Sequence, residues 1–239
     1  LIPTGSTVAI GPGGVASIPK PYSTSINGEG SSVICAGDWN AKVKTSTIDL
    51  TMTSNCATLQ WGNNVFRTLT IDSGAYVSVI CEVASPVYTN SLLVEDNAIL
   101  NIPRDSTICV AMSDIDSTIH IDGAIRGMGL FDVATSYDRD LDLSGVSVGD
   151  MVVRPSKSAT SPRTVILRGG DDILANHLTL MDPSAKMMTV TAVGALYVGA
   201  ISITDTVTLR GDGATIYTAA WDSSAGTWTP EESTVVLRD

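Results

Sequence analysis

Three aspartates in the middle of the chain have the spacing of a cation site. Asp138, Asp140 and Asp142 alternate along the sequence, so on an extended strand their carboxylates share one face. A bound cation would offset their mutual repulsion, and calcium suits hard oxygen ligands best. The spacing begins like a calcium-binding loop, but its twelfth position is Gly149, which supplies no carboxylate. We therefore keep two interpretations, a calcium site and an acidic face screened by water and salt.

Four cysteines are the second group of residues that could carry out chemistry. Cys35, Cys56, Cys81 and Cys109 follow one another at similar intervals. If each interval is one repeat of the fold, the cysteines stack on neighbouring strands about 4.8 Å apart, near the separation that a disulfide spans. We predict the bridges Cys35–Cys56 and Cys81–Cys109 among the three connectivities that four cysteines allow. Buried thiols, bridges between chains and a zinc site are the alternatives, although no C-x-x-C pair occurs.

Catalytic motifs are scarce. His120 lies between Ile119 and Ile121, so we expect it on the face opposite these core residues, near Asp116 and Asp122. His177 is expected at the surface or in a turn. No phosphate loop, dinucleotide fingerprint, H-E-x-x-H or G-x-S-x-G sequence occurs. We therefore expect a protein that is not an enzyme, with calcium as the one cofactor to consider.

The sequence Gly169-Gly170-Asp171-Asp172 resembles the paired aspartates of polygalacturonase-type β-helix enzymes. In that family the adjacent carboxylates supply the catalytic acid and base. The resemblance covers these four residues, and the family's Gly-His-Gly and Arg-x-Lys sequences are absent. We predict a turn here.

A recurring local pattern predicts the elements that position these residues. Two apolar residues flank a variable one, a turn with Asp or Gly follows, and another alternating run begins, as in 69–79 and 93–102. Weaker copies cover 119–125, 141–148, 178–183 and 201–209. The turns start at 72, 96, 122, 144 and 169, and this nearly regular period predicts an all-β fold, a parallel β-solenoid. An antiparallel β-sandwich, which needs no fixed turn spacing, is the alternative.

The composition supports strands over helices. The 239 residues include 20 Asp but 5 Glu, and 44% of them are hydrophobic. Asp favours turns and Glu favours helices. The net charge of −11 argues against a nucleic-acid partner, and no apolar run approaches the roughly 20 residues of a membrane-spanning helix. With 5 Lys to protect strand edges, the chain is predicted to assemble with copies of itself.

The domain organisation is predicted from the same signals. Residues 1–30, rich in Gly, Pro and Ser, are expected to form an extended N-terminal arm, and residues 31–239 a single all-β domain. Residues 154–163 are predicted to be a loop, and 214–229 an antiparallel hairpin closed by a five-residue loop. Because the sequence begins with Leu1, we expect a processed chain whose secretion signal has been removed.

The repeated L-x-[IVL]-x-D-[SG]-[AG] pattern, the abundant Thr and Ser, the scarce Lys and the cysteine spacing resemble those of extracellular β-rich proteins of microbial surface layers and sheaths. The likeness covers roughly residues 30–220, and an archaeal sheath or S-layer subunit is the type that it names. It implies an extracellular structural subunit joined to its copies by strand pairing and disulfides.

Two other functions remain open from the sequence. One is a carbohydrate-binding or polysaccharide-depolymerising β-helix of the phage tail-spike type, which would carry paired carboxylates beside aromatic side chains. The other is a secreted adhesin, which would show an apolar patch at 154–163 or around Trp221 and Trp228.

Overall fold

The computed structural model is all-strand, and its parallel sheets form a β-solenoid of about eight turns. It describes residues 7–10, 15–17, 31–36, 38–40, 48–60, 65–81, 86–183, 185, 187–204 and 206–238, among which there is no helix. The β-solenoid prediction is confirmed. The antiparallel sandwich is excluded, because the strand pairings recorded for these residues are parallel.

The chain forms two compact units, one from Leu1–Val110 with Thr118–Gly129 and one from Ala111–Ser117 with Leu130–Asp239. The strands of the first unit are β1 (Thr7–Ile10), β2 (Val15–Ser17), β3 (Ser31–Cys35), β4 (Asp38–Asn40), β5 (Ile48–Met52), β6 (Asn55–Gln60), β7 (Val65–Ile71), β8 (Tyr76–Ile80), β9 (Val87–Val94), β10 (Ile99–Asn101), β12 (Ile119–Ile121) and β13 (Ala124–Arg126). Residues of β11 (Thr107–Met112) belong to both units. The strands of the second unit are β14 (Leu130–Thr135), β15 (Arg139–Asp142), β16 (Val146–Pro155), β17 (Arg163–Arg168), β18 (Ala175–Leu180), β19 (Met188–Val193), β20 (Ala195–Ile203), β21 (Thr208–Arg210), β22 (Thr215–Thr218), β23 (Ala220–Asp222), β24 (Thr227–Thr229) and β25 (Thr234–Leu237).

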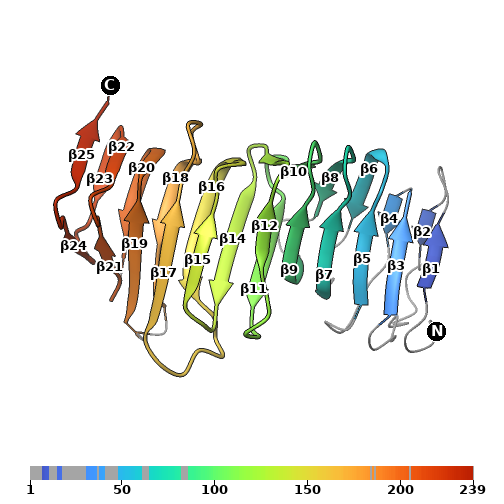
Figure 1. The fold of residues 1–239 in the computed structure, drawn as a ribbon, viewed down its shortest axis with the longest axis horizontal. Coiled ribbons are helices and arrows are strands. Elements are labelled where there is room, and N and C mark those ends of the chain that lie inside the picture. The colour runs from blue at the N-terminus through green and yellow to red at the C-terminus, as the bar shows by residue number, and fades with distance from the viewer. Residues whose placement is uncertain are drawn as a thin grey trace. The chain divides into compact units, whose positions relative to one another are not determined.

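Aliphatic side chains stack from turn to turn in the first unit. Strands β1, β3, β5, β7 and β9 pair in that order and lie side by side in Figure 1. Val33, Leu50, Leu69 and Leu92 are register partners on four of these strands, and all four are buried. The step along the sequence is longer from Leu69 to Leu92 than from Val33 to Leu50. The turns therefore vary in length while the buried position is kept.

The predicted turns form corners that stack on one another. The backbone N–H of Ala75 donates to the carbonyl of Asp72 at 2.9 Å, and that of Ala98 donates to the carbonyl of Glu95 at 3.0 Å. The N–H of Ile99 then donates to the carbonyl of Ala75 at 2.8 Å, which joins one corner to the next. The turns predicted at 72 and 96 are confirmed, and they carry the chain from one buried strand into the next.

The second unit repeats this construction. Strands β14, β16, β18, β20 and β23 pair in one series, and β15, β17, β19, β21 and β24 pair in another (Figure 1). Val133, Val153, Leu180 and Ile203 form a buried ladder whose steps along the sequence are again unequal. Burial of one side of each strand explains the alternating sequence pattern.

The predicted C-terminal hairpin is wrong. Strands β22, β23 and β24 lie within residues 214–229, but each pairs in parallel with an earlier strand, β22 and β23 with β20 and β24 with β21. Trp221 and Trp228 occupy the positions that continue the buried ladders of Ile201 and Leu209. The two strands are thus successive sides of one solenoid turn.

Two other predicted segments differ in extent. Arg154 and Pro155 end β16 and Arg163 begins β17, so the loop predicted over 154–163 is limited to residues 156–162. Of the predicted arm over 1–30, the structure describes 7–10 and 15–17, which form β1 and β2 and pair with β3 and β4. The rest of that segment lies outside the described residues.

Candidate assembly surface on the last turn

The three aspartates of the predicted calcium site have separate partners. Asp138 Oδ1 accepts a hydrogen bond from the backbone N–H of Thr164 at 2.8 Å, and Asp142 Oδ1 accepts one from the N–H of Ser144 at 3.0 Å. Asp140 forms a bidentate ion pair with Arg168, with both contacts at 2.8 Å. Within the described ranges, no three His, Cys, Asp or Glu side chains gather in a geometry that could hold a metal ion. The calcium site stays a prediction, and Arg168 is the cation beside this face.

This ion pair has a pH-dependent consequence. The hydrogen bond from Arg168 holds the pKa of Asp140 below its ordinary value. A lowered folded-state pKa means that the stabilisation is complete above the unfolded-state pKa and is lost as the pH falls through the folded-state pKa. Both side chains are about half exposed, so the effect on stability is small.

Replacing Arg168 by glutamine is expected to raise the pKa of Asp140 toward its ordinary value, as measured by an NMR titration of the side-chain carboxyl groups. Asp222 is the internal control, because its lowered pKa comes from hydrogen bonds with Ser224. An Asp140 titration curve that does not move in Arg168→Gln would contradict the assigned cause.

The first two cysteines do not occupy equivalent positions on successive turns. Cys35 ends β3, and its register partner on the next turn is Met52. Cys56 lies in β6, which pairs with β4 and β8, and the register shifts between its two neighbours in sequence. The expected stacking of these cysteines is therefore wrong. Because the turns differ in length, two residues separated by about one turn in the sequence need not occupy equivalent positions. The side chain of Cys56 lies outside the described residues, so the Cys35–Cys56 bridge stays a prediction.

The second predicted bridge, Cys81–Cys109, is not formed in the structure. Cys81 is a thiol that follows β8. Its Sγ accepts the backbone N–H of Thr107 at 3.0 Å and donates to the carbonyl of the same residue at 3.3 Å. Cys109 lies in β11 beside Tyr88 and is buried.

The histidines and the paired aspartates lie at the surface. His120 Nε2 is 2.9 Å from Asp122 Oδ2, and both side chains are exposed, which confirms the expected orientation of His120. His177 is exposed and its Nε2 lies 2.9 Å from Ser202 Oγ. Asp171 and Asp172 are exposed in a bend between β17 and β18, as the turn prediction requires.

The last described turn leaves core positions partly uncovered. Ile201 and Leu209 are buried, with 1% and 0% of their surface exposed, because the next turn covers them. Their register partners on that next turn, Trp221 and Trp228, are half-buried. The two indole rings contact each other edge to face, with ring centroids 5.1 Å apart. Together they present an aromatic surface where a further turn would stack.

The final strand shows the same change. Ile216 in β22 is fully buried, whereas its register partner Val235 in β25 is half-buried. Leu237, the last residue of β25, is 68% exposed. Apolar surface at this end of the second unit therefore extends from the two tryptophans to β25.

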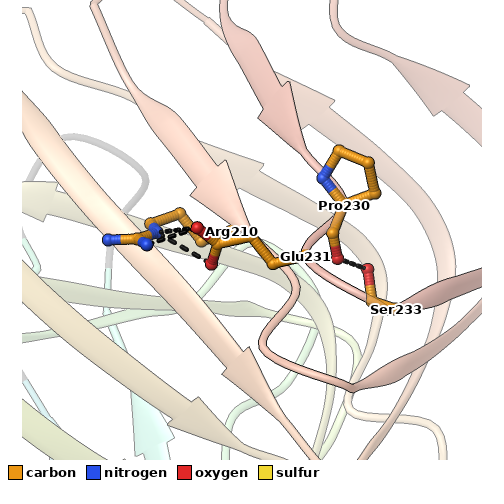
Figure 2. A network of polar contacts seen from close by, with 4 residues as sticks. All are labelled: Arg210, Pro230, Glu231 and Ser233. Carbon is orange, nitrogen blue, oxygen red and sulfur yellow. Dashed lines mark hydrogen bonds and ion pairs between the residues drawn. The ribbon is translucent and has the colours of Figure 1, made fainter.

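Polar contacts hold the last turn in place without covering its core positions. Figure 2 shows Arg210, at the end of β21, reaching Glu231 in the connection between β24 and β25. Arg210 Nε lies 3.0 and 2.9 Å from the two carboxylate oxygens. The backbone N–H of Ser233 donates to the carbonyl of Pro230 at 2.8 Å and closes the turn, and the Ser233 hydroxyl donates to the same carbonyl.

The most regular aromatic contact runs along the turns. Tyr197 and Tyr217 are register partners whose rings are stacked, 4.5 Å apart and 3° from parallel. The Arg238 guanidinium lies beside both rings, 4.2 Å from the centroid of Tyr217 and 5.1 Å from that of Tyr197. Each ring covers one face of the other. The pair therefore continues the stacking of register partners from one turn to the next.

Sequence reasoning noticed the two tryptophans but missed β25. The signal was present, because the run Thr234-Val235-Val236-Leu237 follows a turn. Thr234, the first residue of β25, pairs with Thr215. The distance between these two residues along the sequence equals the distance between the register partners Leu50 and Leu69. A strand at this position therefore matches the shorter turns of the molecule.

Comparisons of the chain with protein-family models, curated proteins and solved structures find no match. Nor does the described part of the chain contain a helix with the length and apolar character to span a membrane.

Proposed function

We propose that the chain is a structural, non-enzymatic subunit whose copies join end to end in an extracellular assembly such as a cell sheath, surface layer or filament. The observation that carries the proposal is the partly uncovered core at Trp221 and Trp228. A solenoid buries the apolar face of each turn by stacking a further turn on it. Aromatic and aliphatic side chains of this turn are left part-exposed, and a second copy stacked on them would bury them.

The strand edges provide the hydrogen-bonding groups for such a joint. The recorded pairings give β23, β24 and β25 a neighbour on the side of the preceding turn, and β1 and β2 a neighbour on the side of the following one. A strand edge without a partner pairs readily with another chain. Joining the last described turn of one copy to the first described turn of the next would keep the strands parallel, and the same contact can repeat from copy to copy.

The composition supports the same function. Only 16% of the residues are charged and 5 are Lys, so like-charge repulsion offers little protection against edge pairing. The resemblance to sheath and surface-layer proteins supports an extracellular location.

The proposal predicts concentration-dependent assembly that depends on the last turn. Replacing Leu237 by glutamate places a charge at the joint, and because this side chain is 68% exposed, the core of the subunit is left intact. We expect the concentration needed for half-assembly to rise at least about tenfold, which corresponds to about 1.4 kcal/mol. Trp228→Glu is expected to have a larger effect. Sedimentation velocity and electron microscopy, with and without reductant, measure both.

Ile173→Glu is the matched control. Ile173 is an aliphatic residue with 55% exposure between β17 and β18, away from the last turn, so the same charge there should leave assembly unchanged. Circular dichroism checks that each variant keeps its fold. Wild-type protein that stays monomeric at every concentration and redox condition would falsify the proposal.

A further inference from the structure

Two arginines converge on one tyrosine ring in the second unit. Arg139 lies at the start of β15 and Arg163 at the start of β17. Their guanidinium carbons are 5.5 and 5.8 Å from the ring centroid of Tyr137. Two guanidinium groups therefore lie beside one ring, with the carboxylates of Asp116 and Asp138 nearby.

Each guanidinium retains a donor without an acceptor. Among the described residues, the Nε atoms of Arg139 and Arg163 are buried and have no hydrogen-bond partner. The two Nη groups of Arg139 donate to backbone carbonyls, at 3.0 Å to Ile115 and 2.5 Å to Asp114, which holds this side chain in place. Arg163 Nη1 donates to the carbonyl of Pro162 at 3.2 Å. Buried donors in a native protein normally have an acceptor, so these two N–H groups beside one ring are suited to bind one.

Other arginines of the chain pair with carboxylates, whereas Arg139 donates to backbone carbonyls. Arg67, Arg168 and Arg210 each have a carboxylate neighbour, and hydrogen bonding to that carboxylate raises the pKa of each guanidinium. Burial instead lowers the pKa of Arg139, against weaker attraction from Tyr137 and Asp116. Arg139 is thus partly desolvated, while its hydrogen bonds go to neutral carbonyl groups.

We propose that Arg139 and Arg163 bind one oxyanion beside Tyr137, a carboxylate, sulfate or phosphate group. Its oxygens would accept the two Nε–H groups and the Nη2–H of Arg163. The Nε and Nη2 edge of a guanidinium presents two parallel donors that match two oxygens of such a group. Both Nε atoms are buried, so the site must open to admit the anion. Arg139 is held by two carbonyls, so we expect Arg163, which borders the connection 156–162, to be the side chain that moves.

NMR observation of the arginine Nε–Hε groups tests the site directly. Sodium sulfate, phosphate and acetate are titrated into the intact chain at constant ionic strength with chloride, and methyl phosphate is added as a fourth probe. We expect saturable shifts of the Arg139 and Arg163 signals with at least one of these ions. Binding of methyl phosphate would show that an esterified group on a larger molecule also fits, and its exclusion would restrict the site to the free ion.

Two variants separate charge from geometry. Arg163→Lys keeps the charge but removes the paired donors, so the dissociation constant read at Arg139 should rise at least tenfold. Arg163→Gln should abolish the saturable shift. Arg67, which pairs with Asp49 in the first unit, is the control and should not respond. Unchanged affinity in either variant overturns the proposal. So do unsaturating shifts shared with Arg67, which would mean an adventitious ion only. Assembly plays no part in this test, so its failure would leave the proposed function standing.

Discussion

Replacing Leu69 by alanine is expected to lower the free energy of unfolding by about 2–5 kcal/mol. Leu69 is fully buried, and its register partners on the neighbouring turns are Leu50 and Leu92. Strand pairing holds the backbones of both leucines in place, so their side chains fill only part of the cavity that the substitution leaves. Chemical denaturation followed by circular dichroism measures the loss, and amide hydrogen exchange in β5, β7 and β9 locates it.

Thr70→Ala is the matched control for this prediction. Thr70 is the next residue of β7 and is half-buried on the outward side of the strand. Its replacement is expected to change the free energy of unfolding by no more than about 0.5 kcal/mol. Equal losses at the two positions would contradict the assignment of Leu69 to a core ladder.

Replacing Gly127 by alanine is expected to cost about 2–6 kcal/mol, as the sum of backbone strain and a steric conflict. Gly127 has φ of +124°, and an added Cβ would overlap the carbonyl oxygen of Ile102. That carbonyl also accepts the N–H of Gly129 at 2.8 Å, so it is held in place. Backbone strain contributes about 1–3 kcal/mol and the steric conflict about the same. Thermal and chemical unfolding measure the sum.

Gly74→Ala separates these two causes. Gly74 also has a positive φ, +74°, but no atom lies within 4 Å of an added Cβ. The expected loss is about 1–2 kcal/mol, the cost of the left-handed conformation alone. If Gly127→Ala lost no more than Gly74→Ala, the close approach to Ile102 would not be the cause.

The strands and corners could be predicted from the sequence, because burial and turn preferences act on neighbouring residues. Whether two strands pair in parallel or antiparallel could not be predicted in the same way. Residues 65–71 and 87–94 alternate because one side of each strand faces the core. Asp72 and Gly74 mark a corner because both residue types favour turns. Trp221 and Trp228, however, lie on strands that alternate in the same way in a hairpin and in a solenoid. The short connection between those strands suits either arrangement, so the choice required the ladders of the preceding turn.

The candidate sites depended on contacts between turns. The alternation of Asp140 and Asp142 correctly predicted two exposed carboxylates, but Arg168 reaches Asp140 from 28 residues further along the chain. The cysteine spacing was close to the turn period, yet Cys35 lies opposite Met52. Periodicity predicts that turns stack, but the register of each turn is set by the length of its own connections.

The unequal turns bear on how such a chain can change during evolution. More of the chain separates the register partners Val153 and Leu180 than separates Val133 and Val153, yet both steps return the chain to the same buried position. Insertions and deletions in the connections, such as 156–162, therefore need not shift the phase of the core. The outward connections can diverge rapidly while the buried ladder is conserved, so related chains could share this scaffold and still display different surfaces.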